Sequence, residues 1–288
     1  MEDQTGLAKV TRRRRKISRR GLLLTASAFA ALVAVSVPVY RSAARHTGQA
    51  DRASNLGDGL LRAAIVDQLS RQAPNPGFVQ RVTGILRKAD YTVDYFPAAE
   101  VTVEFYRDLP RGRYDLVVLR THSAPASKGT PKKVRATEEI GLFTGELHVP
   151  GRYEEEARAE LLGLAYYTYE DYATGRQRPS VAVLPAFIRS RMRGDLGGAV
   201  VVLMGCETFK TLSAPKALFD RGAGAVIGWD GLIEGAYSDA VTELLVQNLS
   251  AGLPPDQAVL RTSRVAGQDP SSGARLAIYP ADTPGSTP

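Results

Sequence analysis

Four residues whose side chains could do chemistry follow apolar runs of the kind that form buried strands. They are Asp67 after "LRAAIV", His122 after "LVVLRT", Cys206 after "VVVLMG" and Asp230 after "AVIGW". The functional site of an open α/β sheet lies at the carboxyl ends of its strands, so all four residues are expected at one edge. A thiol is a useful nucleophile when a base favours the thiolate, and a histidine on a neighbouring strand end could supply that base.

Cys206 and His122 each have a structural interpretation as well. A lone cysteine is most often a small buried hydrophobe, and a lone histidine is often a hydrogen-bonded structural residue. Because each follows a buried strand and each is followed by small or polar residues, the two together favour the catalytic interpretation. The nucleophile elbow of α/β-hydrolases fits poorly, because it needs small residues where Met204 and Thr208 stand.

The residue counts exclude several kinds of site. Cys206 is the only cysteine in 288 residues, which excludes an intrachain disulfide and any metal site with several cysteine ligands. With only three histidines in the chain, a zinc site is not expected. No nucleotide-binding motif is present, so we expect neither a metal nor another cofactor. His148 is interpreted as a surface residue of a hairpin.

The net charge of +7 is concentrated at the N-terminus. Residues 1–46 hold ten Lys and Arg against two acidic residues, whereas the rest of the chain holds 27 basic and 28 acidic residues. The part expected to fold is therefore close to neutral, and we expect no nucleic-acid partner.

Residues 21–40, "GLLLTASAFAALVAVSVPVY", form an uncharged span between Arg20 and Arg41. As a helix rising about 1.5 Å per residue, this span covers the apolar core of a bilayer. The basic residues within 1–20 are expected to stay in the cytoplasm, which puts the rest of the chain outside. A cleaved export signal is the alternative, since "SRRGLLL" is similar to twin-arginine signals and residues 42–44 are small. The chain is thus expected to be a single-pass membrane protein, or secreted if the signal is cleaved.

Residues 41–58 are typical of a linker, and a domain with alternating patterns covers residues 59–268. Continuous apolar runs alternate with segments of helical periodicity, which predicts an α/β fold: an open, mostly parallel sheet with helices on both faces. Strand-like runs lie in 61–69, 91–96, 114–123, 198–205 and 224–231; helix-like segments lie in 75–90, 103–109, 214–223, 235–252 and 254–267.

Residues 124–195 break this alternation and are interpreted as an insertion. They contain a strand-like segment, 141–149, and an acidic helix-like segment, 153–167. A long excursion beside a site is often a lid or specificity element. The tail, residues 269–288, is rich in proline and small residues and is predicted to be disordered.

The segments "YDLVVLRTHS" and "VVVLMGCET" resemble the caspase-like (clan CD) cysteine peptidases. In that clan a buried strand ends in His-Gly or His-Ser, and a later buried strand ends in Ala-Cys or Gly-Cys. "LMGC" is closest to the separase and CHAT versions, and "TLSAPKALFDRGAGAVIGWDG" is similar to the segment after the cysteine in CHAT and gingipain-like domains. The resemblance covers roughly residues 60–265.

The resemblance implies a role for each site residue. Cys206 would be the nucleophile, and His122 the general acid/base that assists thiolate attack and protonates the leaving amine. Backbone N–H groups of Ser123 and Gly205 would hold the oxyanion. Ser123 stands where the clan usually has glycine. The 84-residue separation of His122 and Cys206 is longer than is usual in the clan.

Substrate choice in this clan commonly depends on the residue before the scissile bond. Asp67 and Asp230 stand where clan members place pocket residues, and their carboxylates would favour Arg or Lys. Each is equally open to a structural interpretation as a turn or helix-cap aspartate.

The function expected from these features is that of a membrane-anchored, extracytoplasmic cysteine endopeptidase acting on a protein or peptide substrate. Two alternatives remain open: a caspase-fold binding module that does not use its dyad, and a thiol hydrolase of a non-peptide acyl substrate.

Overall fold

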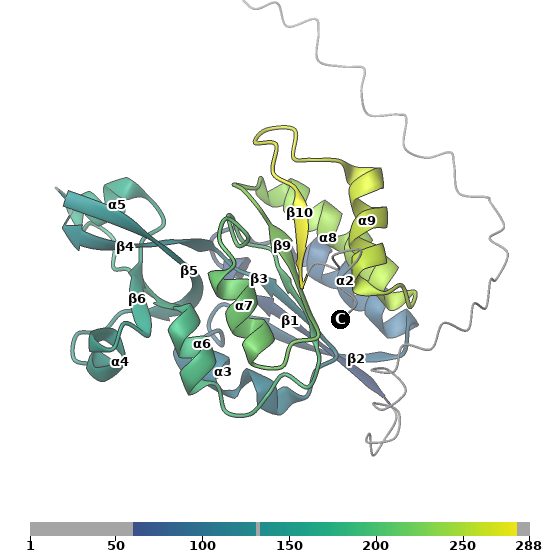
Figure 1. The fold of residues 1–288 in the computed structure, drawn as a ribbon, viewed down its shortest axis with the longest axis horizontal. Helices are drawn as coiled ribbons and strands as arrows, with labels where there is room; N and C mark the ends of the chain where they lie inside the picture. Colours follow the sequence, from purple (N-terminus) through teal and green to yellow (C-terminus); the bar gives the residue numbers. More distant parts are fainter. Residues whose placement is uncertain (1–59, 131–132, 281–288) are drawn as a thin grey trace, which may run out of the picture. The chain divides into compact units, whose positions relative to one another are not determined.

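A six-stranded sheet is the centre of the fold (Figure 1). Its strand order is β10-β9-β8-β3-β1-β2, and every neighbouring pair is parallel except β9 with β10. The predicted α/β class with a mostly parallel sheet is therefore confirmed. The strands are β1 (Leu61–Asp67), β2 (Tyr91–Pro97), β3 (Leu116–Arg120), β8 (Val200–Leu203), β9 (Ala225–Trp229) and β10 (Leu276–Tyr279).

The structure is a computed structural model, and it describes residues 60–130 and 133–280. The predicted membrane span, its basic flank and the linker lie outside the described residues. Within the described ranges, no helix has both the length and the apolar character that crossing a membrane requires.

Three helices cover one face of the sheet: α2 (Pro76–Lys88), α8 (Gly235–Ser250) and α9 (Pro255–Ala266) (Figure 1). The amide oxygen of Asn75 accepts a hydrogen bond from Phe78 N–H at 3.0 Å, so Asn75 is the N-cap of α2. The apolar faces of these helices form one core cluster with the side chains on this face of the sheet, among them Ile65, Phe78, Val82, Val118, Leu245 and Ala258.

The opposite face packs against α3 (Val103–Asp108), α6 (Pro185–Arg191) and α7 (Ser213–Asp220). Two 3₁₀ helices, η1 (Gln68–Ser70) and η2 (Leu109–Gly112), follow β1 and α3. The core on this side contains Tyr106, Phe187 and Leu218, all fully buried. Helices on both faces account for the continuously apolar strands seen in the sequence.

The segment predicted as an insertion forms a second sheet, which begins at the residue after His122. Its strand order is β4-β5-β7-β6, and all its pairs are antiparallel. The strands are β4 (Ser123–Thr130), β5 (Lys133–Leu147), β6 (Leu162–Ala165) and β7 (Ser180–Val183), with the short helices α4 (Glu154–Arg158) and α5 (Tyr169–Thr174) in the connections.

Alternation along these strands gives the second sheet one bulky face and one face of mostly small residues. Leu142, Val183 and Leu162 lie side by side on the first face and are buried in the core shared with α3 and α6. On the other face, Ala182 lies opposite Phe143 and Gly163. Large side chains therefore fix the second sheet to the domain, whereas its outer face keeps little side-chain volume.

Two sequence predictions are wrong. The acidic segment 153–167 is not one helix: α4 ends at Arg158, and residues 162–165 form β6, because Leu162 pairs with Val183 and is buried. The tail is not disordered from residue 269, since residues 276–279 form β10 against β9. Leu276 and Ile278 supply the apolar contacts that order this strand, and residues 281–288 lie outside the described residues.

Candidate active site

His122 and Cys206 follow neighbouring strands of the six-stranded sheet. β3 pairs with β8 in parallel, and Leu119 lies opposite Leu203. His122 and Cys206 are each three residues beyond this pair, so they leave the sheet at the same level. Met204 N–H donates to the carbonyl oxygen of Leu119 at 3.0 Å, which keeps the two chains together past the end of β8.

Gly205 is where the two segments approach most closely. A Cβ here would lie 2.2 Å from Ser123 Oγ and 2.6 Å from the carbonyl oxygen of Thr121. No real side chain tolerates such distances, so the residues on both sides of His122 require glycine at this position. Ser123 Oγ also donates to the carbonyl oxygen of Cys206 at 2.5 Å. The backbone of Cys206 is thereby fixed against the backbone around His122.

The imidazole of His122 packs against two aromatic rings of the second sheet. Its centroid lies 5.2 Å from that of Tyr167 and 5.9 Å from that of Phe143. Gln68, which is fully buried, accepts the His122 N–H at 2.9 Å and donates Nε2–H to the Tyr167 hydroxyl at 3.0 Å. One glutamine thus holds both the main chain of His122 and the ring beside its imidazole.

Burial lowers the pKa of His122 below its ordinary value of 6.5, and the positive charge of Arg120 lowers it further. The imidazole is therefore neutral at pH 7, which is the form in which it can accept a proton from a thiol.

The thiol of Cys206 is half-buried and has a weak partner. Its S–H donates to the carbonyl oxygen of Ile233 over 3.7 Å, whereas the ring contacts of His122 are with Phe143 and Tyr167. Across the described residues, no hydrogen bond joins the thiol to the imidazole. Contacts between reacting side chains often close only when substrate binds, so this separation is compatible with a dyad.

The chain turns sharply immediately after Cys206. Glu207 has a φ of 55°, in the left-handed region that costs a non-glycine residue about 1–2 kcal/mol. Its N–H donates to the carbonyl oxygen of Gly231 at 2.8 Å, and Phe209 N–H donates to that of Trp229 at 2.8 Å. These bonds join the turn after the cysteine to the end of β9. Strain of this kind tends to occur at functional sites.

The two residues predicted to hold an oxyanion, Ser123 and Gly205, contact each other. Ser123 lies opposite Leu142 in the β4–β5 ladder, and Phe143 N–H donates to the carbonyl oxygen of His122 at 3.0 Å. This pattern makes Ser123 and Leu142 a pair without mutual hydrogen bonds, so the Ser123 N–H points out of the ladder.

Asp67, predicted as a substrate-binding residue, is 1% exposed and paired inside the protein. Arg120 Nη1 donates to its Oδ1 at 2.8 Å, and Tyr95 donates to its Oδ2 at 3.3 Å. Burial raises the pKa of Asp67, although the hydrogen bond and charge of Arg120 oppose this effect. Both oxygens are engaged and closed off from solvent, which argues against a pocket role and for a structural one.

Arg120 itself joins the end of β3 to elements on either side. It donates Nε–H to Asp239 Oδ1 at 2.8 Å, a second bond to Asp239 Oδ2 at 3.0 Å, and one to the carbonyl oxygen of Ala73 at 2.9 Å. Asn75 also donates to Asp239, at 2.8 Å. One guanidinium two residues before His122 therefore ties together β1, β3, α8 and the start of α2.

Asp230, the other predicted substrate-binding residue, is exposed at the end of β9. Its Oδ1 accepts the Arg275 N–H at 2.7 Å, which connects β9 with the approach to β10. Since Glu207 is bonded to the neighbouring Gly231, Asp230 lies on the segment that packs against the cysteine turn. The structure therefore brings His122, Ser123, Gly205 and Cys206 together, leaves Asp230 beside them, and assigns Asp67 to the interior.

Gln68, Tyr167 and Asp239 support this site, and the sequence analysis did not single them out. Arg120 is a sequence signal that could have pointed to Asp239, because it is a charged residue at the end of an otherwise apolar strand. Buried arginines are almost always paired, so an acidic partner is expected. Gln68 and Tyr167 lie 99 residues apart and carry no local signal. In the described part of the chain, no group of His, Cys, Asp and Glu residues is arranged to hold a metal ion.

The chain matches no protein-family model, and no curated protein matches it in sequence. The assignment of this site therefore rests on the residues and on their geometry.

Replacing Gly205 by alanine should separate the two segments. The added methyl group would overlap Ser123 and Thr121, and overpacking of this kind costs about 1–3 kcal/mol of folding free energy. Thermal unfolding of Gly205→Ala should show this loss. The matched control is Gly235→Ala, where a Cβ meets no atom within 4 Å. Equal melting temperatures for the two variants would contradict the close approach described here.

A second prediction concerns the titration of His122. The folded chain holds this proton less tightly than the unfolded chain, so the NMR midpoint of the His122 ring should lie below 6.5 in the folded protein and near 6.5 in urea. The neutral imidazole of His122 therefore contributes to folding stability above pH 6.5. This contribution is lost as the pH falls from 6.5 through the pKa of the folded protein. Resonances assigned with a His122→Gln variant provide the measurement. A folded midpoint above 6.5 would contradict the argument.

Proposed function

We propose that this chain is a caspase-like cysteine endopeptidase with Cys206 as nucleophile and His122 as general acid/base. The observation that carries the proposal is the contact of Gly205 with Thr121 and Ser123, which fixes Cys206 beside the histidine segment at the carboxyl edge of a mostly parallel sheet. A free, half-buried thiol and a neutral imidazole that follow neighbouring strands are the minimum set of groups for acyl transfer through a thioester.

The reaction follows from these two side chains. His122 takes the thiol proton as Cys206 Sγ attacks the scissile carbonyl carbon, and the carbonyl oxygen becomes an oxyanion facing the N–H groups of Ser123 and Gly205. Collapse of this intermediate breaks the C–N bond, and the imidazolium gives its proton to the leaving amine. Water, deprotonated by His122, then attacks the thioester, which releases the acid product and restores the thiol.

The proposal includes a preference for Arg or Lys before the scissile bond. Asp230 supports it, because its carboxylate is exposed on the segment bonded to the cysteine turn. Asp67 contributes to folding rather than to this preference, because its carboxylate is paired with Arg120.

The proposed location is outside the cytoplasm, attached to a membrane through residues 21–40. This part rests on the apolar span and its basic flank in the sequence. A substrate would then be a peptide or protein exposed on the outer side of that membrane.

Replacing Cys206 or His122 tests the dyad. On a mixture of fluorogenic peptide amides, Cys206→Ala should abolish turnover, and His122→Ala should lower kcat by about 10²–10⁴-fold, the typical contribution of a general acid/base. The matched control is His148→Ala: this residue lies just after β5, where its backbone N–H donates to the carbonyl oxygen of Pro179 and its backbone carbonyl accepts from Arg178.

Turnover that survives in Cys206→Ala would refute the proposal. Wild-type thiol reactivity toward iodoacetamide without cleavage of any peptide would favour the binding module instead. Hydrolysis of thioesters or esters alone would favour the non-peptide acyl hydrolase.

The charge of Asp230 can be tested without disturbing its structural bond. Asp230→Asn keeps the oxygen that accepts the Arg275 N–H but removes the charge. It should lower kcat/KM for peptides with Arg or Lys before the scissile bond by about 10- to 100-fold, the size expected for one charged hydrogen bond, and leave Ala peptides unchanged. An unchanged ratio of Arg to Ala peptides would remove Asp230 from the substrate site.

A further inference from the structure

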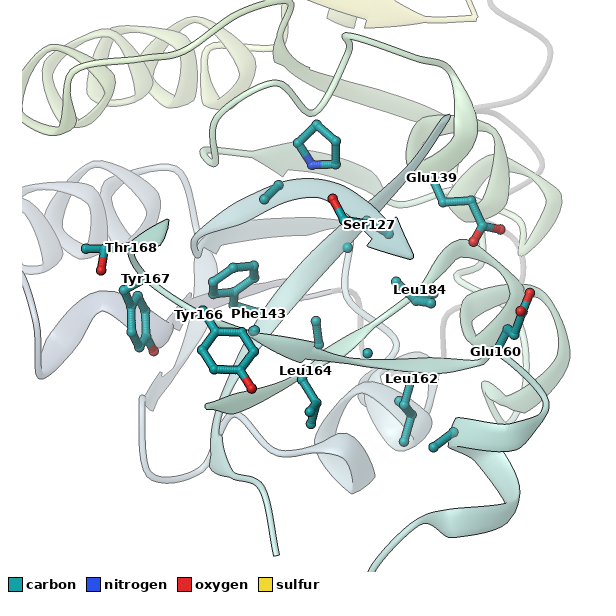
Figure 2. Close-up of a pocket in the computed structure, with 18 residues that line it drawn as sticks. Ser127, Glu139, Phe143, Glu160, Leu162, Leu164, Tyr166, Tyr167, Thr168 and Leu184 are labelled. Carbon is teal, nitrogen blue, oxygen red and sulfur yellow. The ribbon is translucent and has the colours of Figure 1, made fainter. Parts of the chain in front are cut away.

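A cavity of about 560 Å³ lies on the outer face of the second sheet (Figure 2). Its volume falls within the roughly 300–1,000 Å³ of ordinary ligand sites. The cavity exists because strand positions that point outward carry small residues: Gly163 lies opposite Ala182, and Gly141 lies opposite Ala124. Such a face offers backbone and methyl groups to an apolar occupant.

One end of this cavity is formed by the residues that hold the candidate catalytic histidine. Phe143 and Tyr167 line the cavity, and the same two rings pack against the imidazole of His122. The rings of Phe143 and Tyr167 also contact each other, with centroids 5.7 Å apart. The cavity and the imidazole of His122 therefore share these two rings as neighbours.

The other end of the cavity is acidic. Glu139 and Glu160 lie there, at the end away from Tyr167 (Figure 2). Among the described residues that line the cavity, the charged ones are Glu139 and Glu160, and the others are apolar or uncharged. The charge and the apolar floor together select an occupant that is apolar along its length and cationic at one end.

We infer that this cavity binds the substrate of the proposed peptidase, and that the part it takes is a bulky apolar side chain, Leu or Phe, next to a basic residue. This inference rests on the proposed function, because it takes the scissile carbonyl to lie between His122 and Cys206. A peptide held there with its Arg or Lys toward Asp230 has its neighbouring apolar side chain within reach of Phe143, Tyr167 and the small outer face. A second basic residue on the far side of that apolar residue would face Glu139 and Glu160.

Filling the cavity tests the inference. A Cβ at Gly163 would meet only Leu184 Cδ2, at 3.8 Å, so Gly163→Val should fold while it occupies the floor. Its kcat/KM should fall by about tenfold or more for peptides with Leu or Phe beside Lys, and stay within about twofold for the same peptides with Ala in place of Leu or Phe. Gly84→Val is the matched control, since a Cβ there meets no atom within 4 Å.

Two further variants test the same inference, so that it does not depend on Gly163→Val alone. Ala182→Leu fills the cavity from the neighbouring strand and should produce the same selective loss. Glu139→Gln should weaken peptides with a second Lys on the far side of Leu or Phe by up to about fivefold, as expected of an exposed ion pair, and spare the peptides in which this second Lys is replaced by Gln.

Binding to the Cys206→Ala variant separates failure of this inference from failure of the proposed function. Fluorescence anisotropy should give tighter binding of Leu-Lys and Phe-Lys peptides than of Ala-Lys peptides, and Gly163→Val should remove the difference. Equal affinities, with wild-type turnover intact, would overturn the cavity assignment and leave the peptidase standing. Selective binding that depends on Gly163, with no turnover by the wild type, would support the cavity as a peptide-binding site and contradict the proposed peptidase activity.

Discussion

The pairing of Arg120 with Asp67 and Asp239 is the interaction on which the candidate site depends. The guanidinium is 3% exposed, and an unpaired charge at that depth would cost several kcal/mol. Its bonds reach β1 through Asp67 and α8 through Asp239, so the carboxyl ends of the central strands cannot move independently. Removing one partner from a buried pair typically costs about 3–5 kcal/mol, because the remaining charges are left uncompensated. The site thus lies on an edge of the sheet that buried ion pairs hold together.

From this edge the chain positions the histidine from two directions. Arg120 fixes the strand two residues before His122, and β4 begins one residue after it, so the second sheet is attached directly to the site. Gln68 joins the two, since it bonds to the main chain of His122 and to Tyr167 in the second sheet. The same charge that fixes the strand also keeps the imidazole neutral, because Arg120 adds to burial in lowering the pKa of His122. Arg120 therefore both fixes the end of β3 and contributes to the lowered pKa of His122.

The order of strands and helices could be predicted from the sequence because each element carries its own periodicity. Buried runs such as residues 200–203 and the cap at Asn75 are local signals, and they give the parallel sheet and its carboxyl edge. Residues 153–167 misled the prediction because four glutamates and three alanines favour a helix locally, whereas burial of Leu162 against Val183 is a long-range effect. β10 was not predicted for the same reason, because this strand forms by pairing with β9, which is distant in the sequence.

The site could be predicted in part for the same reason. His122 and Cys206 are visible as reactive residues that follow buried strands. The interior role of Asp67 could not be predicted, because it depends on an arginine 53 positions away. The cavity was equally hidden: small residues at alternate positions in β5, β6 and β7 mean little until the register places them on one face.

The central claim is that Cys206 and His122 act on one carbonyl group, and a crystal structure of a covalent adduct tests it most directly. A peptide aldehyde ending in lysinal forms a hemithioacetal with a nucleophilic cysteine, and this adduct imitates the tetrahedral intermediate. We expect a bond from Cys206 Sγ to the aldehyde carbon, with a ring nitrogen of His122 about 2.6–3.2 Å from the hemithioacetal oxygen or sulfur. An adduct in which the His122 ring stays on Tyr167 and Phe143 without reaching either atom, or a Cys206 that forms no adduct, would contradict it.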